Sequence, residues 1–221
     1  MNPKISVAVP CYNDEKIILE SYKEIKQELE KLSLSYEIIF CNDGSTDRTL
    51  EILNRIRDED SNMRLISYSP NRGLAYAYKQ LFSQASGEII ITMDSDLSMQ
   101  PKDTLPLFLK EIKNADIVSG SRYAGIKPEY PLYRLIPSKI NLFLARFFLN
   151  CRLSDTNSGF LAIRKRVLQE LELISSGLEI YIELFLKAIK KGFVISEVPI
   201  LYVHKTKSGE MSVLRHGPKK Y

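Results

Sequence analysis

Cysteine and histidine are scarce in this sequence, and their spacing excludes the usual disulfide and zinc frameworks. The chain has 221 residues, of which 3 are cysteine and 2 are histidine. Cys11, Cys41 and Cys151 form no CxxC pair, and no histidine lies at metal-ligand spacing from them. A sparse and odd set of cysteines is typical of a reducing compartment. We interpret Cys11 and Cys41, which fall at the ends of predicted strands, as small buried hydrophobic residues.

The chain also lacks a long apolar run and a strong excess of one charge. No uninterrupted apolar stretch reaches the ~18 residues that a membrane span needs. The N-terminus leads almost at once into a strand pattern, so we expect no signal peptide. A net charge of +4 and a pI near 8.8 are too mild to indicate nucleic acid as a partner. What is left is an ordinary globular composition, at a length that suits one large domain.

The first two thirds of the chain alternate between strand and helix patterns. Short β-branched runs predict strands, and amphipathic stretches that begin with capping residues predict helices. The predicted strands cover residues 5–10, 36–41, 64–69, 88–93 and 116–123, and the predicted helices cover 13–32, 45–59, 73–85 and 102–113. Strict alternation predicts a parallel sheet with helices on both faces, whose ligands bind at the carboxyl ends of the strands.

The stretch IITMDSDLSMQP, residues 90–101, leads an apolar strand into two acidic residues. Residues i and i+2 of a strand point the same way, so we expect Asp94 and Asp96 about 7 Å apart on one face. Carboxylates this close repel each other unless a positive charge lies between them. One interpretation is a strand-end turn whose solvated acids cap the next helix. The other is a site for a divalent metal ion.

Two further polar clusters follow predicted strands, at residues 10–13 and 41–45. Gly44 permits a tight turn with close backbone approach. The residues from Ser45 to Asp47 fit an Asx turn and a helix cap. Asp43, at the strand end, can equally accept a hydrogen bond from a nucleobase or a ribose hydroxyl. Three polar clusters on one edge of one sheet are hard to explain by turns alone.

The pattern changes after residue 123. An apolar helix is predicted over 134–150, a strand or turn leading into a helix over 160–168, a helix over 178–192, and one or two strands over 193–204. A basic stretch that contains glycine and serine follows. The sequence contains no internal repeat and no low-complexity segment.

Several short motifs occur in one order along the chain: VAVPCYNDE, YEIIFCNDGSTDRT, NRGLAYAYKQ, IITMDSDLSMQP and GSRY. Together they resemble the inverting family 2 glycosyltransferases. The later stretches RLIPSKINLFLARFFL, SDTNSGFLAIRKRVL and EVPI resemble, within that family, the polyprenyl-phosphate glycosyltransferases of the dolichol-phosphate mannose synthase type. The resemblance covers nearly the whole chain.

The resemblance implies an α/β chain with the A-type glycosyltransferase fold, a Rossmann-like, mostly parallel central sheet with helices on both faces. It implies the inverting transfer of a hexose from a nucleotide-sugar donor, of the GDP-mannose or UDP-glucose type, to a polyprenyl-phosphate acceptor, either dolichyl or undecaprenyl phosphate. It also implies a catalytic domain over 1–204, with a nucleotide-sugar half at about 1–123 and an acceptor half at about 124–204. The basic tail over 205–221 would then follow the catalytic domain.

The same resemblance assigns residues to the donor and its metal ion. The residues expected to line the nucleotide pocket are Pro10, Tyr12, Asn13, Asp14 or Glu15, Asp43, Arg72 and Gly73. Asp94 and Asp96 are expected to bind Mg²⁺ or Mn²⁺ that bridges the donor diphosphate, because hard cations take carboxylate and phosphate oxygens. Ser98 stands where some relatives have a Gln, and its hydroxyl is a candidate third ligand.

Arg122 is expected to face phosphate, and Asp155 to assist the reaction or to hold the structure. Arg134 and Ser138, four residues apart on one helical face, are expected to bind the acceptor phosphate. Lys205 and Lys207 stand where relatives often carry an Arg that closes over phosphates, although a charge run is commonly just solvated. The nucleophile would be a phosphate oxygen that is already ionised at pH 7, so little is needed from a general base.

The resemblance places the chain in the cytoplasm, peripheral at the cytoplasmic face of the membrane. Residues 140–149 are either a core helix or an interfacial helix that guides a polyprenyl chain. Two other functions stay open. One is a family 2 enzyme that acts on a sugar hydroxyl, for which Asp155 is the candidate base. The other is a non-catalytic module that binds a sugar nucleotide or docks to a membrane.

Overall fold

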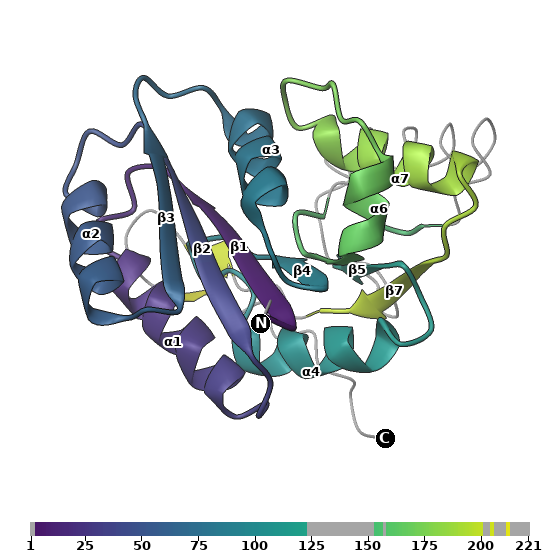
Figure 1. Cartoon of the computed structure of the whole chain (residues 1–221), viewed down its shortest axis with the longest axis horizontal. Helices are drawn as coiled ribbons and strands as arrows, with labels where there is room; N and C mark the ends of the chain where they lie inside the picture. Colours follow the sequence, from purple (N-terminus) through teal and green to yellow (C-terminus); the bar gives the residue numbers. More distant parts are fainter. Residues whose placement is uncertain (1–2, 123–152, 157, 201–203, 206–210, 213–221) are drawn as a thin grey trace.

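The computed structural model describes residues 3–122, 153–156, 158–200, 204–205 and 211–212. Its centre is a seven-stranded sheet with the order β3-β2-β1-β4-β6-β5-β7 (Figure 1). The strands of this sheet are β1 (Ile5–Cys11), β2 (Tyr36–Asp43), β3 (Met63–Tyr68), β4 (Ile89–Thr92), β5 (Ile117–Ser121), β6 (Leu161–Arg164) and β7 (Ile195–Pro199). β8 (His204–Lys205) and β9 (Met211–Ser212) form a separate antiparallel pair.

Helices cover both faces of the sheet, as the alternation predicts. They are α1 (Ile18–Glu30), α2 (Thr49–Glu59), α3 (Leu74–Gln84), α4 (Pro101–Glu111), α6 (Lys165–Glu170) and α7 (Ile180–Lys190). Buried residues of α1, α2 and α4 share one hydrophobic layer, and those of α3, α6 and α7 share the other. Strand β1 serves both layers, because Val7 and Val9 face the first and Ala8 faces the second.

The sheet is mostly parallel, and one strand departs from that direction. β1 runs parallel to β2 and β4, and β2 runs parallel to β3. β6 is antiparallel to both of its neighbours, β4 and β5. β6 comes from the segment after residue 153, and it lies between β4 and β5, which come from before residue 123. The two halves of the chain therefore build one sheet.

The predicted elements that lie within the described residues are confirmed, with shifts at their ends, whereas the helix predicted over 134–150 lies outside them. The first helix begins at Ile18 and not near residue 13, because Asn13 takes a left-handed conformation with φ 56° and the chain turns before the helix starts. Strand β4 ends at Thr92. The expectation that Asp94 and Asp96 share one face of a strand is therefore wrong, since both lie in the turn that follows it.

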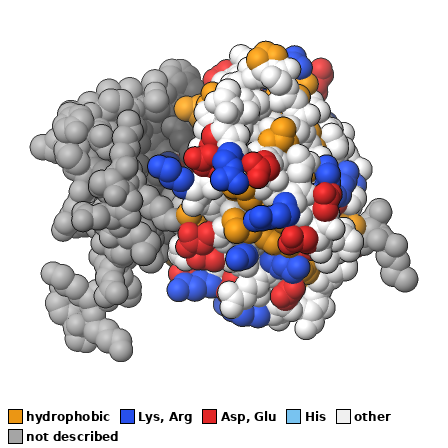
Figure 2. Space-filling view, turned by 90° about the vertical axis from the view of Figure 1, so that its left-hand side faces the viewer, with side chains coloured by type: hydrophobic (Ala, Val, Ile, Leu, Met, Phe, Trp, Pro, Cys, Tyr) orange, Lys and Arg blue, Asp and Glu red, His pale blue; other side chains and the backbone are white. Residues whose placement is uncertain are grey.

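Charged side chains of both signs cover the face that lies over α2 and α1. Figure 2 shows Lys and Arg interspersed with Asp and Glu there, with hydrophobic side chains scattered between them. Exposed pairs on these helices include Arg48–Glu51 and Arg57–Asp58. Such pairs contribute little to stability, and they leave no field of one sign on this face. No helix in the part of the chain that the structure describes could cross a membrane.

A buried carboxylate near the start of β2 leads to a prediction about the stability of the fold. Glu37 on β2 accepts hydrogen bonds from the Ser6 hydroxyl (2.5 Å), the Ser86 amide (2.7 Å) and Arg64 Nη1 (2.9 Å). Burial alone would raise the pKa of Glu37, but these bonds outweigh burial and lower its pKa. The charged form is thus more stable in the folded chain than in the unfolded chain.

Glu37→Gln is expected to reduce the free energy of unfolding by about 2 kcal/mol at pH 7. Because the folded pKa is depressed, this stabilisation is present above the unfolded pKa of about 4.3 and is lost as the pH falls through the folded value. Urea unfolding at pH 7 and near pH 4 measures the difference, which should shrink in acid. Glu88→Gln is the control, because Glu88 is 67% exposed and pairs with Lys4 at the surface. Equal losses at both pH values would contradict the prediction.

Candidate active site

A cavity of about 410 Å³ opens where β1, β2 and β4 end. Parallel pairing in register brings these strand ends together, with Cys11 opposite Asn42 and Ala8 opposite Thr92. The lining residues come from the ends of β1 and β2, from the segments after β1 and β4, and from the start of α3 and the loop before it: Pro10, Cys11, Tyr12, Asp14, Asp43, Asn71, Gly73, Leu74, Ala77, Asp94, Ser95 and Asp96. The polar clusters that the sequence places at strand ends thus meet in one cavity.

Asp94 and Asp96 face this cavity from a tight turn. Leu97 has φ 55°, a conformation that costs energy for a residue with a Cβ, and the Ser98 amide donates to Asp96 Oδ1 at 2.8 Å. Burial, with the charge of Asp96, raises the pKa of Asp94 to about 6, and the charge of Arg122 partly opposes this. Within the described ranges, neither carboxylate forms an ion pair within 4.0 Å. The turn therefore concentrates negative charge.

Asp14 adds a third acid to the same cavity. Its carboxylate accepts from the Ser95 hydroxyl at 2.7 Å and from the Tyr12 amide at 3.0 Å. Burial is the main cause that raises the pKa of Asp14. The sequence offers Asp14 or Glu15 for this pocket, and the structure turns Glu15 away, where it accepts from the Arg48 amide at 3.0 Å. Ser95 thus links the segments after β1 and β4.

The donor set fits a hard divalent cation that completes its coordination with other oxygens. Among the described residues, no group of three or more His, Cys, Asp or Glu is arranged to hold a metal ion. Asp94 and Asp96 supply carboxylate oxygens to which no cationic side chain of the described residues is paired, which suits Mg²⁺ or Mn²⁺ with phosphate and water as further ligands. The Ser98 hydroxyl is buried without a hydrogen-bond partner in the described part of the chain, but Ser98 does not line the cavity.

The Asp43 side chain binds the loop that precedes α3. Its carboxylate accepts from the amides of Arg72 (2.7 Å) and Gly73 (2.9 Å) and from Asn71 Nδ2 (2.9 Å). Gly73 has φ 88°, where a residue with a Cβ would be strained. Asp43 therefore holds the loop and also lines the cavity. A carboxylate offers about four acceptor positions, so three bonds leave room for a ligand group.

The structure separates the other residues predicted for the nucleotide pocket. Pro10, Tyr12 and Gly73 line the cavity, and Tyr12 is 48% exposed at its mouth. The Asn13 side chain instead accepts from the Thr46 amide at 2.8 Å. The Arg72 guanidinium lies 3.7 Å from the centre of the Tyr76 ring. Asn13, Glu15 and Arg72 are not among the lining residues.

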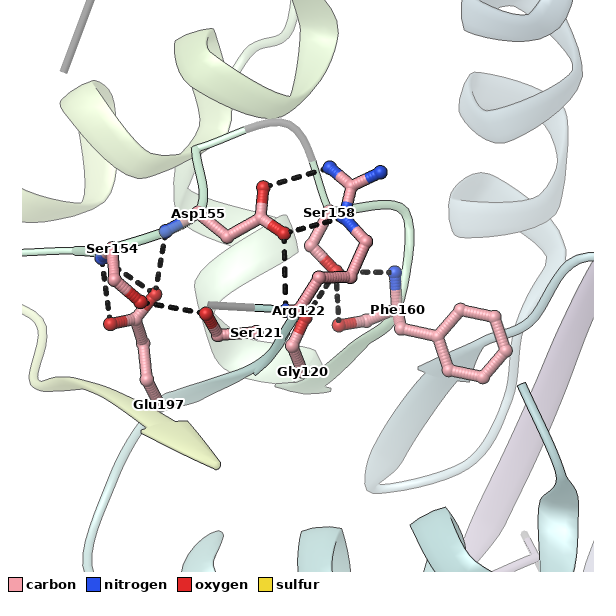
Figure 3. A network of polar contacts seen from close by, with 8 residues as sticks. All are labelled: Gly120, Ser121, Arg122, Ser154, Asp155, Ser158, Phe160 and Glu197. Atoms are coloured by element: carbon pink, nitrogen blue, oxygen red, sulfur yellow. Dashed lines mark hydrogen bonds and ion pairs between the residues drawn. The ribbon is translucent and has the colours of Figure 1, made fainter. Parts of the chain in front are cut away.

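Arg122, which is partly exposed, forms an ion pair with the buried Asp155 beyond the end of β5 (Figure 3). Arg122 Nε donates to Asp155 Oδ2 at 2.7 Å, and Arg122 Nη2 donates to Asp155 Oδ1 at 2.9 Å. The Asp155 side chain is only 2% exposed. The charge of Arg122 also opposes the rise in the pKa of Asp94, although Arg122 is not among the residues that line the cavity. A carboxylate gripped at both oxygens is poorly suited to act as a general base.

Two tyrosines behind Asp94 were not predicted as site residues. The rings of Tyr78 on α3 and Tyr181 on α7 meet edge to face, with centroids 5.6 Å apart. Burial and the charge of Asp94 raise the pKa of Tyr181. A Cβ placed on Gly159 would lie 2.8 Å from the Tyr181 hydroxyl and 3.6 Å from Asp94 Oδ1. Both tyrosines lie within predicted helices, where the sequence pattern is that of ordinary core residues. The sequence therefore carries no separate signal for their position near Asp94.

The residues predicted for the acceptor fall largely beyond the description. Arg134, Ser138 and Lys207 lie outside the described residues, as do Cys151 and the whole of the expected helix over 134–150. Lys205 is described as part of the strand β8, without its side chain. Their assignment to the acceptor phosphate stays a prediction.

The sequence matches the family model described as "Glycosyl transferase family 2" over residues 6–172. It is 34% identical over 204 residues to a dolichol-phosphate mannosyltransferase of Pyrococcus furiosus, covering 90% of this chain and 56% of that protein. It is 29% identical over 197 residues to a dolichol-phosphate mannosyltransferase of Saccharomyces cerevisiae, covering 85% of this chain and 72% of that protein. The chain thus spans little more than half the length of the Pyrococcus relative.

The fold is similar to that of glucosyl-3-phosphoglycerate synthase from Mycobacterium tuberculosis. The crystal structure of that protein with Mn²⁺ and UDP-glucose has a TM-score of 0.67 at 21% identity, covering 93% of this chain and 73% of that chain. The complex with Mn²⁺, UDP and glucosyl-3-phosphoglycerate has a TM-score of 0.66 at 24% identity, covering 90% and 70%. At this identity the similarity shows a shared fold, that of the A-type glycosyltransferases.

Proposed function

The chain belongs to glycosyltransferase family 2, and we propose that it transfers a hexose, with inversion, from a nucleoside diphosphate sugar to a polyprenyl phosphate. The observation that carries this proposal is the cavity in which Asp94 and Asp96 lie together, with the charge of Arg122 acting on the same turn. The two dolichol-phosphate mannosyltransferases among its relatives support the choice of acceptor.

The donor nucleotide is assigned to the part of the cavity between β1 and α3. Tyr12 offers an exposed aromatic ring beside the cavity mouth, which suits stacking on a base. Asp43 retains acceptor capacity for a base N–H or a ribose hydroxyl. Pro10 and Gly73 complete the walls, and neither places a bulky polar group in the way of the nucleotide.

The diphosphate of the donor is assigned to the acidic turn. Asp94 and Asp96 would hold Mg²⁺ or Mn²⁺, which when bound neutralises the charge that develops on the leaving nucleoside diphosphate. Arg122 adds a fixed positive charge on the same side, and Asp155 keeps its guanidinium in one orientation. Because these charges are already in place, little reorganisation accompanies bond cleavage.

The acceptor phosphate needs little help from a base. Its oxygens are ionised at neutral pH, so positioning contributes most of the acceptor-side catalysis. We assign this positioning to Arg134 and Ser138, and we place Lys205 and Lys207 on the same phosphate. A lipid acceptor implies work at a membrane surface, and we place the protein at the cytoplasmic face. Residues 140–149, expected as either a core helix or an interfacial helix, lie outside the described residues. Asp155 is engaged by Arg122, which disfavours a sugar hydroxyl as acceptor, since that chemistry needs a free base.

The test offers polyprenyl phosphate together with a panel of labelled UDP- and GDP-sugars, in the presence of Mg²⁺ or Mn²⁺. The expected result is labelled lipid with one or two donors and no labelled lipid in chelator. Labelled glycan in place of lipid would show that the acceptor is a sugar hydroxyl. Donor binding without product, across dolichyl and undecaprenyl phosphates, would indicate a non-catalytic module and contradict the proposal.

A further inference from the structure

The side chain of Glu197, on the edge strand β7, binds backbone amides of the loop that carries Asp155. Its carboxylate accepts from the Ser154 amide at 2.9 and 2.7 Å and from the Asp155 amide at 3.0 Å (Figure 3). The segment 153–156 belongs to no strand, so these amides have no ladder partner. Hydrogen bonds to a charged acceptor are about twice as strong as neutral ones. Glu197 therefore fixes the two peptide units that lead up to the Cα of Asp155.

The same loop is tied to the end of β5 at two other points. The Ser121 and Ser154 hydroxyls lie 2.6 Å apart, and the Ser158 hydroxyl donates to the Gly120 carbonyl at 2.5 Å. β5 in turn pairs with β7 in parallel register, with Gly120 opposite Val198. The loop, β5 and β7 therefore form one connected block, and Arg122 is the residue that follows β5 in the sequence.

Asp155 transmits this anchoring to Arg122. Its two oxygens accept from two nitrogens of the guanidinium, and Oδ2 also lies 3.3 Å from the Arg122 amide. A planar guanidinium held at two points has one orientation relative to the carboxylate, so the direction of Asp155 sets the direction of Arg122. A small rotation of the Asp155 peptide would move the cationic group relative to Asp94.

We propose that Glu197 is a positioning residue, which orients Arg122 toward the diphosphate of the donor by fixing the backbone of Asp155. The inference rests on the proposed function, since it takes the diphosphate as the group that Arg122 meets. Glu197 itself touches neither cavity nor substrate in this assignment, because it does not line the cavity. Its effect on the reaction passes through Asp155 and Arg122 alone.

A second glutamate provides a matched control. Glu183 on α7 also accepts two consecutive amides, from Ile174 at 2.9 Å and from Ser175 at 2.8 Å. It anchors the loop between α6 and α7, which carries none of the residues assigned to the donor. Replacing Glu183 thus removes the same kind of loop anchor without acting on Arg122.

The experiment compares Glu197→Gln with Glu183→Gln in the full chain, and places Glu197→Gln also in an Arg122→Ala background. We expect Glu197→Gln to lower kcat about tenfold or more, the range seen when supporting residues of a site are removed. Glu183→Gln should lose comparable stability in urea unfolding and keep kcat within about twofold. In the Arg122→Ala background, Glu197→Gln should cause no further loss, since the group that it orients is already gone.

A full and multiplicative loss in the double variant, or an unchanged kcat for Glu197→Gln, would overturn the inference. Where Glu197→Gln does not fold, Glu197→Asp withdraws the carboxylate by one methylene, keeps its charge and gives the same comparison. The affinity for UDP or GDP with Mn²⁺, measured by calorimetry, repeats the cycle without turnover. Nucleotide binding without any lipid product would contradict the proposed acceptor and leave the role of Glu197 standing. No binding of either nucleotide would contradict both the proposed function and the role of Glu197.

Discussion

Replacing Asp96 by Asn is expected to lower kcat by about 10²–10³-fold, the loss typical of removing one group that stabilises developing charge. The substitution removes the charge and keeps the shape. The Asn side-chain oxygen can still accept from the Ser98 amide, as Asp96 Oδ1 does at 2.8 Å, so the turn around Leu97 should persist. The loss would then report on chemistry at the cavity and not on folding.

Turnover at saturating donor and Mn²⁺, together with calorimetric titration of the Mn²⁺–nucleotide pair, measures this effect. The control is Asp103→Asn, which removes an exposed acid from the first turn of α4, outside the cavity. That variant should retain the activity of the original chain. Full activity of Asp96→Asn, or full activity of the original chain in chelator, would contradict the role given to the acidic turn.

Removal of the Arg122 side chain is expected to have the second large effect, in two measurable parts. Arg122→Ala should reduce kcat by about 10²-fold or more through loss of the fixed positive charge. It should also reduce the free energy of unfolding by about 3 kcal/mol, because Asp155, 2% exposed, loses the guanidinium that donates to both of its oxygens. Urea unfolding and steady-state kinetics separate the two parts.

The double variant Arg122→Ala/Asp155→Ala distinguishes catalysis from structure. With both charges gone, the buried carboxylate that lost its guanidinium partner is removed as well, so most of the lost stability should return. The activity should not return, because the positive charge beside Asp94 is still missing. If activity recovers along with stability, Arg122 serves the fold and its assignment to the diphosphate is wrong.

Local patterns determined the elements of this chain and the edge of the sheet where its cavity lies. Short β-branched runs followed by capped amphipathic stretches predict alternating strands and helices, and the structure confirms them. Since parallel strands share one carboxyl edge, the same patterns bring Asp43, Asp94 and Asp96 to one place. Family motifs of a few residues added the glycosyltransferase identity, because each motif is a continuous stretch that is visible without the fold.

The orientation of neighbouring side chains could not be predicted. Asp14 lines the cavity and Glu15 faces the Arg48 amide, although the two are adjacent in sequence. Asn13, just before them, has a left-handed backbone conformation that the sequence does not reveal. Asn13 and Arg72 were also expected in the pocket because they lie in family motifs. In the structure the Asn13 side chain accepts from the Thr46 amide, and the Arg72 guanidinium lies over the Tyr76 ring. The position of a motif thus predicts which segment lies at the cavity. The backbone conformation of that segment decides which of its side chains point into the cavity.

By itself, then, the sequence determined which segments form the sheet, where acidic groups accumulate and to which family the chain belongs. Only the tertiary structure decided which hydrogen-bond and ion-pair partners the polar side chains of the site have. Asp155 lies 33 residues from Arg122, and Ser154 lies 43 residues from Glu197. Nothing local links such positions, because each pairing depends on where β6 inserts and how β7 pairs with β5. Charge and periodicity are properties of a stretch of chain, whereas a hydrogen bond between distant residues exists only once packing has fixed both ends.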